Sequence, residues 1–193
     1  MAKIGGSLLG WAGLRGWLGG FLGEFEISRL VLIAGGGGAA DWVRRLDEAH
    51  GLGEEVAHGL AMRAMDLSAH VLATIIEGAT VVEEGELAAS WAAGRTPILL
   101  ARGVLRADDR RSADPLPHRW DVTSDSIAAR VAERLGASAL ILCKSSPAPS
   151  PPSRAEAARS GLVDPAFLGA ARALPIVVHR NARAPDCRGT PLL

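Results

Sequence analysis

Short apolar runs, separated by longer stretches with helical periodicity, constrain the fold of this chain more than any other feature. A strand that is apolar along its whole length is expected where helices cover both faces of a parallel sheet. Such runs alternate with amphipathic segments along the 193 residues, which indicates a single α/β domain with a largely parallel sheet. The predicted strands are Ala2–Ile4, Arg29–Ala34, Thr80–Val82, Pro97–Ala101, Ala139–Cys143 and Pro175–His179.

The segments between these strands carry apolar residues at helical spacing. The expected helices are Leu8–Phe25, Asp41–His50, Glu54–Glu77, Glu86–Ala92 and Asp164–Ala173, together with one that follows Trp120. Other segments are charged, or rich in proline and serine, and we expect them to be irregular. These are the surface loops Val104–Arg119 and Ser145–Ser160 and the tail Asn181–Leu193.

The composition excludes several classes of function. Lys plus Arg and Asp plus Glu both number 21, so the charge gives no argument for a nucleic-acid or membrane partner. The apolar N-terminal stretch is interrupted by Arg15 and falls short of the roughly 20 residues that span a bilayer, so we expect no signal peptide or membrane segment. Cys143 lies in a predicted core strand and Cys187 in the tail, which indicates no disulfide framework and a cytoplasmic location.

The stretch Trp120–Lys144 combines a capped helix with a buried strand. Thr123 or Ser124 can cap the helix, and Asp125 lies in its first turn, where the helix dipole favours an anion. Gly136 is expected to end the helix, and Lys144 ends the following strand. From the residues alone, Asp125 can be only a helix-stabilising acid and Lys144 only a solvated charge.

Two glycine turns are predicted to lead from strands into helices, at 5–7 and at 35–38. Helix N-termini with accessible backbone N–H groups bind phosphate, and ligands of open α/β sheets lie at the carboxyl ends of the strands. Either turn alone can equally be a tight connection. Lys3 lies in a strand expected at or near the centre of the sheet, where a lysine requires an anionic partner unless it reaches solvent. No HExxH, CxxC or GxSxG motif is present, so metal and nucleophilic chemistry find no support.

Three motifs together resemble the amino acid kinase superfamily, which includes aspartate, acetylglutamate, glutamate and uridylate kinases. They are KIGGSL at Lys3–Leu8, LIAGGGGAAD at Leu32–Asp41 and DVTSDSIAARVAERLGA at Asp121–Ala137. Two further motifs, at His58–His70 and Arg119–Ala129, are similar to a short branch of this superfamily. That branch phosphorylates a phosphorylated aminomethylfuran to the diphosphate in methanofuran biosynthesis. The resemblance covers roughly residues 2 to 145.

The resemblance implies a three-layer α/β/α sandwich and an ATP-dependent kinase that uses Mg²⁺. It places the small-molecule phosphate acceptor in about residues 1–120 and the nucleotide in about 121–180. It also implies a homodimer, with no nucleic-acid or membrane partner. The helix that carries Trp11, Trp17 and Phe21 can be the dimer interface or an ordinary core face.

The matching positions imply roles for individual residues. Lys3 and Lys144 would stabilise charge on the phosphoryl group in transfer, and Asp125 would orient the two lysines and bind Mg²⁺. The implied nucleotide contacts are Gly5, Gly6, Ser7, Ser124 and Lys144. The implied acceptor contacts are Gly35, Gly36, Gly37, Asp121 and Thr123.

The sequence departs from the superfamily after Lys144. Related kinases have an acidic DVDG-type segment there, whereas this chain has SSPAPSPPSR and no acid before Glu156. Two other functions therefore stay open. The chain can be a non-catalytic binding or regulatory protein on the same fold, or a kinase for another acid or a nucleoside monophosphate.

Overall fold

The computed structural model describes residues 1–25, 29–149, 152–184 and 189–193. Within them, seven strands form one sheet in the order β3-β4-β2-β1-β5-β6-β7, so β1 lies at its centre, as predicted for the strand that carries Lys3. Every neighbouring pair is parallel except β6 and β7. The strands are β1 (Ala2–Ile4), β2 (Leu32–Ala34), β3 (Ala79–Val82), β4 (Thr96–Leu99), β5 (Leu140–Lys144), β6 (Val177–Asn181) and β7 (Thr190–Pro191).

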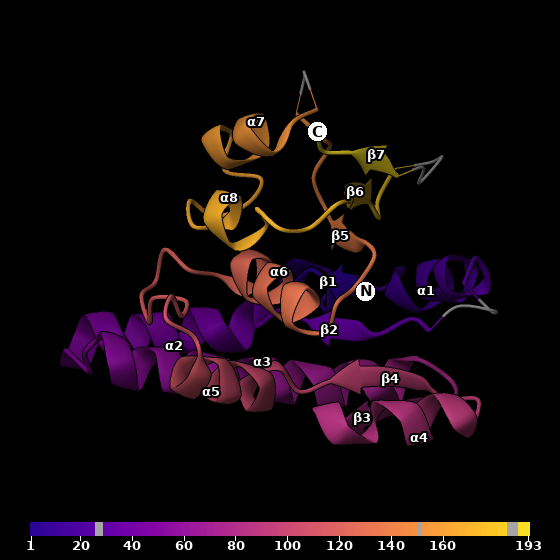
Figure 1. The fold of residues 1–193 in the computed structure, drawn as a ribbon, viewed down its shortest axis with the longest axis horizontal. Coiled ribbons are helices and arrows are strands. Elements are labelled where there is room, and N and C mark those ends of the chain that lie inside the picture. The colour runs from indigo at the N-terminus through magenta and orange to yellow at the C-terminus, as the bar shows by residue number, and fades with distance from the viewer. Residues whose placement is uncertain (26–28, 150–151, 185–188) are drawn as a thin grey trace.

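Helices lie on both faces of this sheet, which gives the predicted three-layer α/β/α sandwich (Figure 1). They are α1 (Leu14–Gly23), α2 (Gly37–His50), α3 (Glu54–Ile75), α4 (Leu87–Ala92), α5 (Ala101–Arg111), α6 (Ser124–Arg134), α7 (Arg154–Arg159) and α8 (Phe167–Ala170). Two short 3-10 turns, η1 (Gly6–Leu8) and η2 (Glu84–Glu86), complete the described elements. In Figure 1, α2 and the first half of α3 reach beyond the sheet as a helical hairpin.

Alternate residues along the strands belong to two separate apolar clusters, one on each face of the sheet. Ile4, Leu32 and Cys143 point to the face covered by α1 and the second half of α3. Ile33 and Leu142 point to the opposite face, which α4, α5, α6 and α8 cover. The alternation places the side chain of Lys3 on the second face, under α6, where an apolar residue would be expected.

The two glycine turns touch each other. A Cβ atom on Gly6 would lie 2.1 Å from the backbone nitrogen of Gly37, and one on Gly35 would lie 2.8 Å from the nitrogen of Gly6. Gly37 also has a positive φ of 53°, which side chains rarely adopt. Both turns therefore require glycine because backbone meets backbone, independently of any ligand.

The segment predicted as the loop Val104–Arg119 is helical in its first part, where it belongs to α5. The inward positions of α5 follow helical spacing, at Ala101, Val104, Leu105 and Asp108. The fourth of them is a carboxylate, so the apolar pattern is broken in the sequence. Asp108 is nevertheless 1% exposed, and it forms ion pairs with Arg130 at 3.0 Å and with Arg134 at 3.2 Å.

Other boundaries also differ from the prediction. The helix expected at Leu8–Phe25 is divided into η1 and α1, and the one expected at Asp164–Ala173 shrinks to the single turn α8. Ser145–Ser160 is not irregular throughout, because Ser153 accepts a hydrogen bond from the Glu156 N–H and begins α7. The predicted tail contains β7, which pairs antiparallel with β6. Cys187 lies outside the described residues.

The apolar side chains of α1 pack onto the core. Phe21 is buried, and Trp17 stacks on it at 5.0 Å between ring centroids. Packing onto the core is therefore enough to explain the apolar face of α1. The homodimer stays a prediction. Among the described residues, no helix combines the length and apolar character required to cross a membrane.

Replacing Gly6 with alanine should destabilise the fold by at least about 2 kcal/mol, because the new methyl group overlaps backbone that cannot move without separating the turns. Gly16 is the matched control, since a Cβ atom there meets nothing within 4 Å. Gly16→Ala should be neutral or stabilising by up to about 1 kcal/mol. Thermal unfolding of the three proteins checks this prediction, and equal melting temperatures for both variants would contradict it.

Replacing Asp108 with asparagine should destabilise the fold by about 3 kcal/mol, because the buried Arg130 would lose its buried carboxylate partner and retain the more exposed Glu133. Asp114→Asn is the control, because the carboxylate of Asp114 is 73% exposed where it pairs with Arg172, and an exposed pair contributes about 0–1 kcal/mol. Urea denaturation gives both values. A loss at Asp108 no larger than at Asp114 would contradict the structural role assigned to this pair.

Candidate active site

A buried carboxylate holds two ammonium groups at the carboxyl ends of the central strands. Lys3 Nζ donates to Asp125 Oδ1 at 2.8 Å, and Lys144 Nζ donates to Asp125 Oδ2 at 2.7 Å. Lys3 and Asp125 are 3% and 4% exposed, whereas the Lys144 side chain retains 17% exposure. Lys144 Nζ also donates to the Leu162 carbonyl. The structure thus brings together all three residues that the sequence proposed as catalytic.

The fold explains how residues so distant in sequence meet. β1 pairs with β5 in a register that aligns Lys3 with Leu142, so Lys144 lies two residues further along the neighbouring strand. Thr123 caps α6 by accepting a hydrogen bond from the Asp125 N–H, which fixes Asp125 in the first turn. The start of α6 therefore presents a carboxylate to both strand ends.

The charges of this cluster stabilise one another. Burial alone would raise the pKa of Asp125, but the ammonium groups of Lys3 and Lys144 and their hydrogen bonds hold that pKa below its ordinary value. Burial lowers the pKa of Lys144, and the nearby charge of Lys3 adds to this effect, while Asp125 opposes it. Two ammonium groups and one carboxylate leave a net charge of +1 (2 − 1), which suits a site that binds phosphate.

Asp164 stabilises the start of α6, whereas sequence reasoning assigned it only to the start of a helix. Its carboxylate accepts from the Thr123 N–H at 3.1 Å, the Thr123 hydroxyl at 2.7 Å and the Ser126 N–H at 3.1 Å. The Ser126 hydroxyl and the Ala166 N–H also donate to it. Asp164 and Thr123 together thus hold the first turn of α6, which carries Asp125. The only sequence signal for this role was an acid directly before Pro165.

Not every glycine assigned to phosphate binding can offer its N–H group. The Gly5 N–H donates to the Cys143 carbonyl at 2.8 Å, and the Gly35 N–H donates to the Ile4 carbonyl at 2.9 Å. Both bonds continue the sheet, so these two glycines do not serve as the phosphate donors that the resemblance implied. Gly6 and Ser7 begin η1, and α2 begins at Gly37 without a side-chain cap, so their first-turn N–H groups lack the usual intrahelical acceptors.

These turns open into a cavity of about 310 Å³ between α2, α3 and the segment before α6. Gly6, Ser7 and Ser124 line it beside the first turn of α2. Apolar side chains line another part of the cavity, namely Ala61, Met62, Met65, Val122 and Ile127. Polar and charged side chains from the hairpin and from the segment before α6 complete the lining, namely Asp41, Arg44, Glu54, His58, Arg119 and Thr123. Gly36 and Gly37, assigned to the acceptor, also line it.

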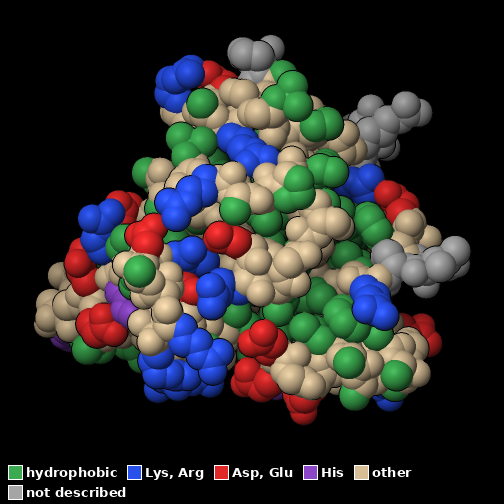
Figure 2. All heavy atoms as spheres, viewed as in Figure 1, with side chains coloured by type: hydrophobic (Ala, Val, Ile, Leu, Met, Phe, Trp, Pro, Cys, Tyr) green, Lys and Arg blue, Asp and Glu red, His purple; other side chains and the backbone are tan. Residues whose placement is uncertain are grey.

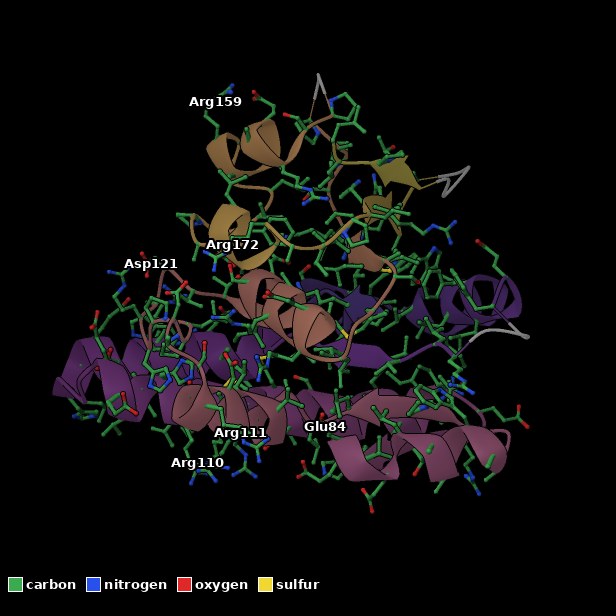
Figure 3. All side chains as sticks on the ribbon, viewed as in Figure 1. Glu84, Arg110, Arg111, Asp121, Arg159 and Arg172 are labelled. Atoms are coloured by element: carbon green, nitrogen blue, oxygen red, sulfur yellow. The ribbon has the colours of Figure 1, made fainter. Side chains whose placement is uncertain are left out.

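Trp120 contributes a rigid aromatic wall, and Asp121 does not line the cavity. Trp120 Nε1 donates to Asp47 at 2.7 Å, and Arg44 lies over its ring at 4.5 Å. The Asp121 carboxylate pairs with Arg119 through two hydrogen bonds of 3.0 and 2.9 Å. Figure 3 shows Asp121 at the outer edge of the molecule. Asp121 therefore orients a lining residue instead of contacting the acceptor itself.

The described residues do not fit the predicted role of Asp125 as a metal ligand. Each of its oxygens already accepts a hydrogen bond from an ammonium group. No group of three or more His, Cys, Asp or Glu side chains within the described part of the chain is arranged to hold a metal ion. The described carboxylates therefore do not supply a metal site.

Comparison with known proteins finds kinases similar to this chain in sequence and in fold. No family model matches the chain. The chain is 31% identical over 114 residues to the [5-(aminomethyl)furan-3-yl]methyl phosphate kinase of Methanocaldococcus jannaschii. The aligned residues make up 59% of this chain and 50% of that protein. The chain thus spans about half the length of the curated relative that it matches.

Two solved structures share the fold. Uridylate kinase from Archaeoglobus fulgidus aligns with a TM-score of 0.52 and 18% identity over 76% of this chain and 64% of that one. Aspartate kinase from Synechocystis aligns with a TM-score of 0.65 and 14% identity over 100% of this chain and 39% of that one. Together with the curated relative, these structures confirm the predicted resemblance to the amino acid kinase superfamily.

Replacing Asp125 with asparagine should cost about 3–5 kcal/mol at neutral pH, because Lys3 and Lys144 would both lose the carboxylate with which they form ion pairs. A carboxyl group with a depressed pKa stabilises the fold above its unfolded-state pKa, and this stabilisation is lost as pH falls through the lower folded-state pKa. The difference between wild type and variant should therefore persist down to about pH 4 and shrink below the ordinary value of 3.8. Urea denaturation at several pH values measures it, and a constant difference down to pH 2 would refute this assignment.

Proposed function

We propose that this protein is an ATP-dependent small-molecule kinase that phosphorylates the phosphate group of a phosphorylated aminomethylfuran. The product is a diphosphate that serves the biosynthesis of a methanofuran-like one-carbon carrier. The observation that carries the proposal is the pairing of Lys3 and Lys144 with one buried carboxylate, at the strand ends where the two glycine turns meet.

The geometry suits phosphoryl transfer, which depends mainly on positioning and on neutralising negative charge. An oxygen of the acceptor phosphate attacks the γ-phosphorus of ATP, the bond to the β–γ bridging oxygen breaks, and ADP leaves. Lys3 and Lys144 stabilise the charge on the transferred group, and Asp125 keeps both ammonium groups in place. The N–H groups of Gly6 and Ser7 are the proposed donors to nucleotide phosphate. Mg²⁺ is expected to accompany the nucleotide, without a role for a protein carboxylate.

The cavity suits a flat acceptor with a phosphate at one end. The first-turn N–H groups of α2 open into the cavity and are the proposed donors to the acceptor phosphate, because helix N-termini bind anions. The apolar side chains and the wall formed by Trp120 match the faces of a five-membered ring. The printed name of the Methanocaldococcus jannaschii relative gives this acceptor.

A non-catalytic binding protein on the same fold is the second candidate. Lys144 is already engaged by two partners, and the first acid after it, Glu156, forms an ion pair with Arg159. Among the described residues that follow Lys144, Glu156 and Asp164 are both engaged, so this part of the chain offers no free carboxylate comparable to the acidic segment of related kinases. Calorimetry with ATP and ADP discriminates between the two candidates, since absence of binding at millimolar nucleotide would favour the second. A panel of other acids and nucleoside monophosphates tests the acceptor.

The kinase assay uses purified protein, ATP, Mg²⁺ and [5-(aminomethyl)furan-3-yl]methyl phosphate, with ADP and the diphosphate as products. Lys3→Ala and Asp125→Asn should each lower kcat by about 100-fold or more, because each removes charge stabilisation that is needed in the transition state. Arg15→Ala is the control, since Arg15 is exposed and bonds only a carbonyl of α3. Wild-type kcat in the Lys3 variant would overturn the proposed mechanism.

A further inference from the structure

Two histidines from different parts of the chain stack at the edge of the cavity. The rings of His58 and His118 lie 4.1 Å apart between centroids and are nearly parallel, at 7°. His58, on α3, lines the cavity. His118, in the segment between α5 and α6, packs against the His58 ring. His118 Nδ1 contacts Glu55 at 2.7 Å, and its Nε2 lies 3.4 Å from Asp109. The proposed phosphoryl transfer uses neither histidine.

His58 lines the end of the cavity that is remote from the glycine turns. Met65 contacts the position of a Cβ atom on Gly36, and Ser68 bonds the Gly36 carbonyl at 3.2 Å, which fixes the middle of α3 beside the second turn. His58 precedes Met65 by seven residues, which corresponds to about 10 Å along a helix. The imidazole therefore faces the part of the cavity remote from Lys3 and Asp125.

The surroundings shift the pKa values of the two rings in opposite directions. Burial and the neighbouring His118 lower the pKa of His58, although Asp109 and Glu55 oppose this. Burial would also lower the pKa of His118, but its contacts with Glu55 and Asp109 prevail and raise it. These shifts favour the neutral form of His58, in which one ring nitrogen accepts a hydrogen bond. Within the described part of the chain, neither nitrogen of His58 forms a hydrogen bond.

We propose that His58 determines acceptor specificity by accepting a hydrogen bond from a primary ammonium group at the end of the acceptor opposite its phosphate, with His118 as its positioning residue. This inference rests on the proposed function, since it concerns the acceptor of that reaction. In this proposal His58 recognises the amine, and the recognition depends on pH because His58 titrates.

The other charged groups around His58 favour a cation over an anion. Asp41 and Glu54 line the same cavity, and neither forms an ion pair within the described residues. Of the two cations that line it, Arg119 is paired with Asp121, and Arg44 lies over the ring of Trp120. Figure 2 shows a histidine among acidic side chains on the side of the molecule where α2 and α5 lie.

Charged and titratable groups near His58 come from three helices and the segment before α6. Glu55 on α3, Asp109 on α5 and His118 affect the pKa of His58. Glu54 on α3, Asp41 and Arg44 on α2, and Arg119 line the same cavity. Protonation of His58 removes the acceptor atom and repels an ammonium group. The preference for the amine should therefore be complete above the ordinary histidine pKa of 6.5 and disappear as pH falls below it.

The experiment compares two ligands by calorimetry without nucleotide. They are [5-(aminomethyl)furan-3-yl]methyl phosphate and its analogue with a methyl group in place of the aminomethyl group. Wild type should bind the amine about 10-fold more tightly or better at pH 7.5, the scale of one hydrogen bond to a charged group. His58→Phe, which preserves the stacked ring, should remove this preference, and the control His70→Phe, exposed on the same helix, should retain it. Circular dichroism checks that each variant folds.

A second measurement needs no mutation at His58. The ratio of the two affinities is followed from pH 8 to pH 5, which cancels the titration of the phosphate group common to both ligands. The ratio should fall as pH falls in wild type, and it should fall at higher pH in His118→Phe, because the charge that lowers the His58 pKa is gone.

The outcomes separate this inference from the proposed function. Equal affinities of wild type for the two ligands, or a preference that survives in His58→Phe, would overturn the inference. A preference that depends on His58, together with no turnover of ATP, would support the inference and reject the kinase. Turnover without any preference would support the kinase and reject the role of His58.

Discussion

The shared carboxylate of Asp125 is the interaction on which the rest of the structure depends. Two buried or partly buried ammonium groups at the ends of adjacent parallel strands would repel each other and lose hydration without it. The capped first turn of α6 supplies that carboxylate, and Asp164 holds the turn in place. One cluster thereby joins the first strand of the chain, the sixth helix and the segment before α8. Its net positive charge is also what the proposed chemistry uses.

The contact between the two glycine turns is the second constraint, and it is steric. The first turn of η1 and the start of α2 approach so closely that neither Gly6 nor Gly37 has room for a side chain. This approach places the N-termini of two helical elements at one sheet edge, beside Lys3. Backbone packing consequently brings the proposed nucleotide-phosphate donors next to the cavity, while Asp125 brings the two ammonium groups together.

The sequence predicted the sheet and the proximity of Lys3, Lys144 and Asp125 well, for physical reasons. Apolar runs and glycine turns are local signals, and a lysine in a central strand requires a partner, which Asp125 supplies. The helix α5 was missed because its fourth inward position is Asp108, whose arginine partners lie on another helix and cannot be found from local periodicity. The N–H groups of Gly5 and Gly35 were misassigned because their use in the sheet depends on strand pairing. Asp164 and the stacked histidines were equally invisible, since both depend on contacts between distant segments.

The helical hairpin of α2 and α3 has a consequence for how this protein can change. The hairpin is one continuous stretch of chain that starts at the second glycine turn, and much of the lining of the cavity remote from that turn comes from it. The three charges of the central cluster come from outside this stretch. An exchange of hairpin residues would therefore change which molecule the cavity accepts and leave the proposed phosphoryl-transfer residues in place. The part of the chain that shapes the cavity and the part that carries the central charges are thus separate stretches of sequence.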